Sequence, residues 1–102
     1  MDLLAKLTEL GFTEYEAKVY LALLDDYPAS GYQISKTAGV PRSMVYEALG
    51  RLKLRGAVLE TSDERATLYR PLPPDVLLDN HEAAQRRLID ELGAGLTGLA
   101  QA

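Results

Sequence analysis

Cysteine is absent from this 102-residue chain, and histidine occurs only once. Without cysteine, the chain has no disulfide, iron–sulfur cluster, thiolate zinc site or thiol nucleophile. The lone histidine, His81, has no second histidine and no close carboxylate pair at the spacing of metal ligands. We therefore interpret His81 as a residue of a dimerisation helix, and we expect neither a metal nor a cofactor.

Long uncharged apolar runs are also missing. The first ten residues carry Asp2, Lys6 and Glu9 among their leucines, unlike a signal peptide or a membrane span. This pattern predicts a cytoplasmic protein without a membrane partner. The chain further lacks a glycine-rich phosphate loop and a nucleophile paired with a base, so we do not expect an enzyme.

The composition that remains is that of one packed domain. Hydrophobic residues make up 47% of the chain and charged residues 25%, which is too apolar for a disordered protein. A chain of about 100 residues ordinarily builds a single core. We therefore expect the whole chain to fold as one unit.

Charge is distributed unevenly along the chain. The formal net charge of −4 by itself argues against a polyanionic partner such as DNA. Residues 1–30 hold two lysines and six acids (net −4), residues 31–72 hold seven basic residues and four acids (net +3), and residues 73–102 hold two arginines and five acids (net −3). The middle segment is therefore the part that can attract a polyanion.

Helix start and stop signals divide the first half of the chain. They predict four helices, near residues 2–10, 13–26, 31–38 and 41–55. Asp2 can cap the first helix, while Thr13 with Glu16 and Ser30 with Gln33 have the spacing of capping boxes. A glycine follows three of these helices, where a left-handed conformation can end them: Gly11, Gly39 and Gly56.

Only Gly39 and Val40 separate the third helix from Pro41, which is favoured in the first turn of a helix. The fourth helix then has a continuous apolar face made of Val45, Ala48, Leu49 and Leu52. Two helices joined by a tight glycine-containing turn are typical of a helix-turn-helix.

After Gly56 the residue pattern changes from that of a helix to that of extended strands. Residues 57–61 and 66–70 form two short strands around a polar turn, and this hairpin is the wing of a winged helix. Leucines at helical spacing predict a final helix from about residue 75. Glycines at positions 93, 95 and 98 each cost roughly 1 kcal/mol relative to alanine, so we expect order to about Leu92 and fraying beyond it unless a partner holds the helix.

The predicted fold class is α+β and mainly helical. Residues 1–72 form a winged helix-turn-helix DNA-binding domain, and residues 73–102 form a C-terminal dimerisation helix whose leucine face outlasts the domain available to cover it. The leucine-rich first helix lies nearby in this architecture, so two copies can cover each other.

Three stretches resemble one known family. They read LTELGFTEYEAKVYLALL from Leu7, GYQISKTAGVPRSMVYEALGRLKLRGAVLE from Gly31, and YRPLPPDVLL from Tyr69. In this order they closely resemble the N-terminal domain of the TrmB-like transcriptional regulators. The resemblance implies a winged helix-turn-helix that binds operator DNA, usually as a dimer.

Longer members of that family carry a C-terminal sugar-binding effector domain, which these 102 residues cannot form. Carbohydrate sensing is therefore not carried over, and no small-molecule effector is assigned. The sequence is either a compact stand-alone regulator or an excised DNA-binding domain.

The apolar face of the fourth helix turns its other residues outward: Arg42, Ser43, Tyr46, Glu47, Gly50 and Lys53. Arg42 and Ser43 lie in the first turn, where free backbone donors attract phosphate and where recognition helices enter the major groove. Arginine can bond a guanine edge twice, and serine and tyrosine can reach phosphate or base. Arg42, Ser43 and Tyr46 are therefore the candidate base readers.

Further cations are candidate anchors. Arg65 in the wing and Arg70 on its second strand could meet the backbone or the minor groove, and Lys53 could meet phosphate. For Lys53, Arg55 and Arg70, plain solvation is equally compatible with the sequence.

Tyrosines have two readings as well. Tyr46 can face DNA, which its helical position favours, or fold back onto the edge of the core. Tyr15, Tyr20 and Tyr32 have apolar neighbours on their helices, and we expect them in the core.

The leading function is thus a homodimeric regulator that binds double-stranded DNA sequence-specifically. A winged-helix protein-interaction module is the alternative, because the acidic flanks and Asp63 and Glu64 in the wing repel phosphate.

Overall fold

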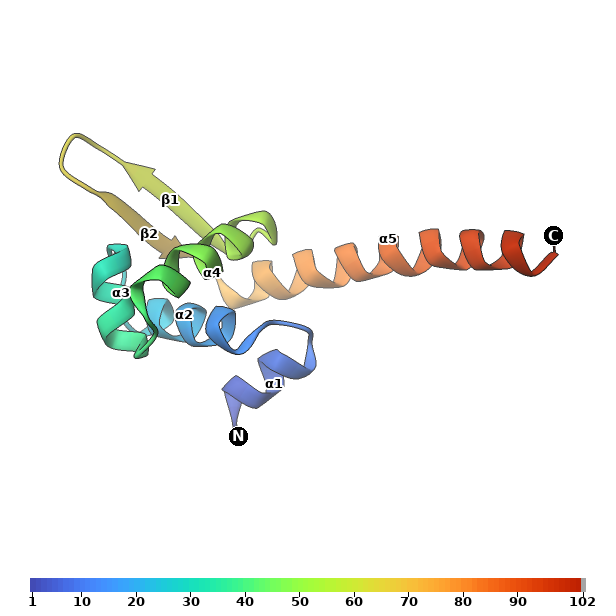
Figure 1. Ribbon diagram of the computed structural model, residues 1–102, viewed down its shortest axis with the longest axis horizontal. Helices are drawn as coiled ribbons and strands as arrows, with labels where there is room; N and C mark the ends of the chain where they lie inside the picture. Colours follow the sequence, from blue (N-terminus) through green and yellow to red (C-terminus); the bar gives the residue numbers. More distant parts are fainter. Residues whose placement is uncertain (102) are drawn as a thin grey trace.

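A computed structural model describes residues 1–101, which form five helices and one two-stranded antiparallel sheet (Figure 1). The elements are α1 (Leu3–Glu9), α2 (Glu14–Asp25), α3 (Gly31–Ala38), α4 (Arg42–Leu54), β1 (Val58–Ser62), β2 (Thr67–Pro71) and α5 (Pro74–Gln101). This order of helices followed by a hairpin is a winged helix-turn-helix, so the predicted fold class is confirmed.

The predicted helix caps are present. Asp2 accepts a hydrogen bond from the Ala5 N–H at 3.1 Å and thereby caps α1. At the start of α2, the Thr13 hydroxyl accepts from the Glu16 N–H at 3.1 Å, and the Glu16 carboxylate accepts from the Thr13 N–H at 2.7 Å. A second capping box, formed by the pair predicted for α3, starts that helix. Each cap satisfies a backbone donor that a helix end would otherwise leave unpaired.

The turn between α3 and α4 is as short as predicted. Gly39 ends α3 with φ +66°, a conformation that a residue with a Cβ rarely adopts. The Ser35 hydroxyl donates to the Val40 carbonyl at 2.6 Å across the turn. This bond holds the chain where it enters α4 at Pro41.

The core lies where α2 meets α3, α4 and the hairpin. The predicted inner face of α4 is confirmed, because Val45, Ala48, Leu49 and Leu52 are all buried. Tyr20 is buried as predicted, and Tyr15 packs against the core while half-buried.

The hairpin pairs Val58 with Pro71 and Ser62 with Thr67 at its two ends. It is joined to the helices by the segment between α2 and α3, because Ala29 and Tyr69 exchange backbone hydrogen bonds of 2.8 and 3.1 Å. The base of the wing is therefore fixed to the domain, while its tip projects (Figure 1).

Helix α5 leaves the domain and extends far beyond it (Figure 1). Its root is attached by Asn80, which donates to the Gly56 carbonyl at 3.2 Å, and by His81, whose ring stacks on Phe12 with 5.5 Å between centroids. His81 thus lies on α5, but its ring packs within the chain rather than facing a second copy. Leu77 is the buried residue of α5.

The expected fraying beyond Leu92 is not seen, since α5 continues to Gln101 through all three of its glycines. Glycine lowers helix propensity, but unlike proline it keeps its N–H donor and introduces no clash. Within residues 1–101, no helix combines the length and the apolar character that a membrane crossing needs.

Candidate nucleic-acid interface

Helix α4 exposes the face that the sequence predicts. The six outward residues named from the helical spacing are all exposed, opposite the buried apolar face. Arg42 and Ser43 occupy the first turn, and Tyr46, Gly50 and Lys53 follow along the helix. The candidate readers therefore share one solvent-facing surface at the N-terminal half of α4.

The N-terminus of α4 differs from those of α1, α2 and α3. Its N-cap is Pro41, and no side chain among residues 1–101 caps it. The backbone donors of Arg42 and Ser43 lie ahead of the first intrahelical hydrogen bond, so they point outward at the positive end of the helix dipole. Such an end is suited to an anion such as a phosphate.

Arg42 lies against α3. Its guanidinium carbon is 5.4 Å from the centre of the Tyr32 ring, and the Lys36 ammonium is 4.9 Å from the same ring. The prediction that Tyr32 belongs to the core is wrong, because its side chain is 48% exposed. Two residues before the buried Ile34, Tyr32 is about 200° around the helix and faces solvent.

Tyr46 combines features of the two positions considered for it, because its ring packs on a neighbouring helix and its side chain is still exposed. Its ring lies along α3, so close that a Cβ on Gly31 would come within 2.6 Å of the ring carbons. The side chain is nevertheless 48% exposed and excluded from the core. The glycine at the start of α3 thus makes room for a tyrosine on the outer face of α4.

The tip of the wing is organised by Asp63. Its carboxylate accepts hydrogen bonds from the N–H groups of Arg65 and Ala66, at 2.8 and 2.9 Å. These bonds stabilise the charged carboxylate and lower the pKa of Asp63 below its ordinary value. The turn holds the exposed Arg65 at the tip.

The second strand of the wing carries Arg70, whose guanidinium carbon is 5.9 Å from the centre of the Tyr27 ring. Its neighbour Tyr69 is buried opposite Glu60. Burial, and then the negative charge of Glu60, raises the pKa of Tyr69 above its ordinary value. Glu60 also binds Lys53 at 3.2 Å, so the charge of Lys53 is partly offset.

Ion pairing sorts the cations of the basic segment into two sets. Three of them pair with carboxylates, and they are Arg51 with Glu47, Lys53 with Glu60, and Arg55 with Glu16. Within residues 1–101, the other four have no carboxylate at ion-pair distance: Lys36, Arg42, Arg65 and Arg70. These four lie on α3, at the start of α4 and on the hairpin. The uncompensated positive charge therefore lies on the elements that surround the outer face of α4.

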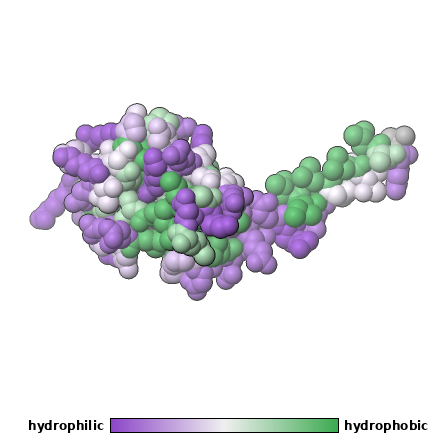
Figure 2. All heavy atoms as spheres, turned by 90° about the horizontal axis from the view of Figure 1, so that it is seen from below, coloured by the Kyte–Doolittle hydropathy of each residue, from purple (hydrophilic) through white to green (hydrophobic). Residues whose placement is uncertain are grey.

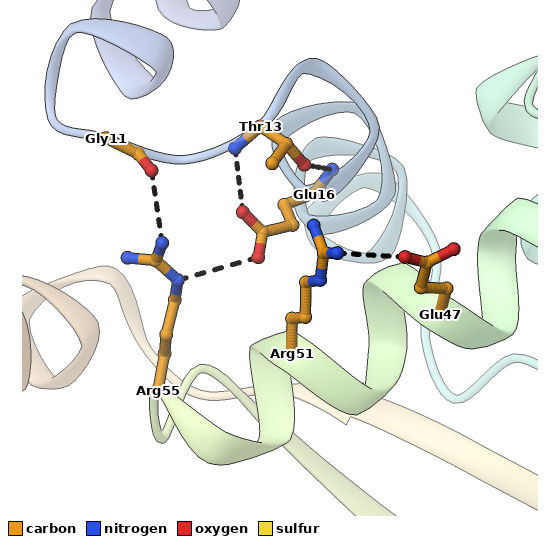
Figure 3. A network of polar contacts seen from close by, with 6 residues as sticks. All are labelled: Gly11, Thr13, Glu16, Glu47, Arg51 and Arg55. Atoms are coloured by element: carbon orange, nitrogen blue, oxygen red, sulfur yellow. Dashed lines mark hydrogen bonds and ion pairs between the residues drawn. The ribbon is translucent and has the colours of Figure 1, made fainter.

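Arg55 has a structural role that the sequence did not predict (Figure 3). Its guanidinium donates to the Gly11 carbonyl at 3.0 Å and lies 4.4 Å from the centre of the Phe12 ring. Its Nε is 3.5 Å from Oε2 of Glu16, an ion-pair distance rather than a hydrogen bond. Glu16 is only 1% exposed, so Arg55 neutralises a buried carboxylate. The capping box pointed to Glu16, but no sequence pattern pointed to its partner 39 positions away.

Fold and surface together define a winged helix-turn-helix in which the outer face of α4 is exposed and lies among cations without carboxylate partners within residues 1–101. Comparison with known proteins agrees. The family described as "Sugar-specific transcriptional regulator TrmB" matches residues 7–75, and the chain belongs to this family. Its membership agrees with the expectation that the protein is not an enzyme.

Individual relatives extend the match. The "Uncharacterized protein YrhO" of Bacillus subtilis is 41% identical over 90 residues, which are 88% of this chain and 32% of that protein. The "HTH-type sugar sensing transcriptional regulator TrmBL1" of Pyrococcus furiosus is 32% identical over 78 residues, 76% of this chain and 23% of that protein. The chain therefore spans a third or less of the length of these relatives.

A solved structure shares the fold. It is that of TrmBL2, described as an archaeal chromatin protein with a novel mode of DNA binding, with a TM-score of 0.80 and 24% identity. The superposition covers 97% of this chain and 38% of TrmBL2.

Proposed function

We propose that the chain is a sequence-specific, double-stranded DNA-binding transcriptional regulator that acts as a homodimer. The observation that carries this proposal is the uncapped N-terminus of α4, which exposes Arg42 and Ser43 among cations that, in the described part of the chain, have no carboxylate at ion-pair distance. The name of TrmBL1 and the description of TrmBL2 agree with it. We assign no carbohydrate effector to these 102 residues, because the sugar sensing in the name of TrmBL1 belongs to that longer protein.

Two sets of residues have different roles on the duplex, one in reading bases and one in binding the backbone or the minor groove. Arg42, Ser43 and Tyr46 face the major groove, where an arginine can bond a guanine edge twice. Lys53, Arg65 and Arg70 bind phosphate or the minor groove and position the protein. Lys53 contributes less than Arg65, since Glu60 already offsets its charge.

Helix α5 supplies the dimer contact in this proposal. Leu88, Ile89, Leu92, Leu96 and Leu99 are about half to three-quarters exposed on the part of α5 that projects from the domain. Figure 2 shows apolar atoms gathered along this projecting part, together with a second apolar area on the domain. A second copy is the occupant that matches a repeated apolar face, because in a symmetric pair each face covers its own equivalent.

Helix α1 favours the same arrangement. It has no buried residue, and with the root of α5 it lines an apolar groove that includes Leu3, Leu7, Leu10 and Leu78. A symmetric pair would place two α4 helices about 34–36 Å apart, at successive major grooves on one side of the duplex.

The test begins with selection of preferred duplexes from random DNA by the purified chain. Binding of Arg42→Ala and Arg65→Ala is then measured on the selected duplex across a range of salt. Arg42→Ala should lose about 1–3 kcal/mol and relax the preference at one base pair. Arg65→Ala should weaken all sequences alike and lower the salt slope by about one unit.

Lys18→Ala is the matched control, because Lys18 lies on α2, outside the proposed DNA and dimer contacts, and is paired with Glu14 at 3.3 Å. It should bind DNA as the parent does. If both test variants, with folding confirmed, match the parent at every salt concentration, the recognition surface is misplaced. If the parent binds no duplex even at low salt, the protein-interaction module favoured by the acidic flanks replaces this proposal.

A further inference from the structure

We propose that Tyr32, Lys36 and Arg42 form one DNA-contacting cluster, in which the Tyr32 ring positions Arg42 for its base contact and Lys36 binds a backbone phosphate. This inference rests on the proposed function and extends the interface from α4 and the wing onto α3. Tyr32 is a positioning residue, since it acts through Arg42.

The geometry brings two cations to one ring. The Lys36 ammonium lies 4.9 Å and the Arg42 guanidinium carbon 5.4 Å from the centre of the Tyr32 ring, both within the range of a cation–π interaction. Tyr32 and Lys36 are four residues apart on α3 and so share a face. Arg42 reaches that face from the first turn of α4.

The charge at this cluster is not balanced by the protein. Within residues 1–101, neither Lys36 nor Arg42 has a carboxylate at ion-pair distance, and both side chains are exposed. Two like charges around one ring repel each other, and an anion placed between them relieves that repulsion. The uncapped N-terminus of α4 adds its outward N–H groups at the same place.

The surrounding backbone is fixed, whereas the Arg42 guanidinium, which makes no hydrogen bond or ion pair within residues 1–101, rests over the Tyr32 ring. Gly39 and the bond from the Ser35 hydroxyl to the Val40 carbonyl set the turn between the helices. An unrestrained arginine side chain loses rotamer entropy when it binds a base. Stacking on a ring already restricts the side chain in the free protein, so the entropy lost on binding is smaller. The planar guanidinium can stack while its edge N–H groups remain available for hydrogen bonds.

The experiment uses the full chain with Tyr32→Leu and Tyr32→Phe, each alone and combined with Arg42→Ala. Binding is measured on the selected duplex and on one altered at the base pair that Arg42→Ala no longer distinguishes. Tyr32→Leu should weaken binding to the selected duplex by about two- to fivefold, the range of an exposed cation–π contact. It should have a smaller effect on the altered duplex, and Tyr32→Phe should bind as the parent does.

The double variant separates positioning from a merely structural role. In the Arg42→Ala background, Tyr32→Leu should cause no further loss. An equal loss on both duplexes, or an undiminished loss without Arg42, would overturn the positioning role. Lys36→Ala should weaken both duplexes equally and reduce the salt slope by about one unit, and an unchanged slope would remove Lys36 from the interface.

A measurement without DNA tests the cluster by itself. The NMR signals of the Arg42 side-chain protons should be shifted upfield by the Tyr32 ring, and Tyr32→Leu should abolish that shift. If the ring shift is absent in the parent, the inference fails even when DNA binding is intact. If the shift is present but the parent binds no duplex, the proposed function fails, and the positioning role on DNA fails with it.

Discussion

Arg55→Ala is the substitution that most sharply separates a structural cation from a DNA-binding one. The change removes the partner of the buried Glu16 carboxylate, a hydrogen bond to the Gly11 carbonyl and a guanidinium stacked on Phe12. Removing one partner of a fully buried pair costs about 3–5 kcal/mol. Because Arg55 is 34% exposed and the pair is 3.5 Å apart, we expect a smaller loss, of about 2–3 kcal/mol.

Urea unfolding measures this loss. The free energy of unfolding should fall by the stated amount, and the melting temperature by roughly 10–20 °C for a domain of this size. Arg51→Ala is the matched control, one helical turn earlier on α4. Arg51 pairs with Glu47 at 2.8 Å, and both side chains of this pair are about half exposed (Figure 3). It should cost only about 0.3–0.5 kcal/mol.

A double variant tests the cause. Glu16→Gln keeps an oxygen that can accept from the Thr13 N–H and removes the buried charge. Combined with Arg55→Ala, it should cost at least about 1 kcal/mol less than the two single losses together. The reasoning is refuted if Arg55→Ala is no more destabilising than Arg51→Ala, or if the two losses simply add.

Three further predictions concern the outer face of α4, the buried tyrosines and α5. Gly31→Ala should displace the Tyr46 ring and weaken binding to the selected duplex, and a Gly31→Ala variant that binds as the parent does would contradict the packing. Gly50→Ala, whose added Cβ would meet nothing within 4 Å in the free chain, should raise the free energy of unfolding by about 0.5–1 kcal/mol, and a urea series that shows a loss would contradict this. Burial raises the pKa of Tyr20 and of Tyr69, and a nearby carboxylate adds to it, Asp75 for Tyr20 and Glu60 for Tyr69. The neutral tyrosines therefore contribute stability that is present below pH about 10 and should be lost as the pH rises through the raised pKa values. A free energy of unfolding in urea that stays constant across alkaline pH would count against this. Leu92→Glu should make the protein monomeric in light scattering at tens of micromolar, where the proposed dimer should persist in the parent, and a monomeric parent there would contradict the proposed dimer.

Local signals predicted the helical part of this fold well. The capping residues of α1, α2 and α3, and the glycine that ends α3, act within a few residues of their own position, so the sequence displays them directly. The inner face of α4 follows from the helical spacing of its apolar residues alone. These features needed no knowledge of what the helix packs against.

Contacts between distant segments were not predictable in the same way. Arg55 was grouped with surface cations because its partner, the carboxylate of Glu16, lies on another helix. Tyr32 was expected in the core because aromatic residues near apolar neighbours are commonly buried, yet it lies about 200° around α3 from the buried Ile34 and faces solvent. The glycines of α5 lowered its helix propensity without interrupting its hydrogen bonds.

Site-directed DNA cleavage tests the central claim, that the wing and α4 dock on a duplex, most directly. The chain has no cysteine, so Glu64→Cys at the wing tip and Thr8→Cys on α1 each accept one DNA-cleaving label. The Glu64 label should cut the selected duplex at two clusters that flank the protected segments and are therefore more than one helical turn apart, and the Thr8 label should cut weakly or not at all. Stronger cutting from α1 than from the wing, or no cutting from either with binding intact, would contradict the account.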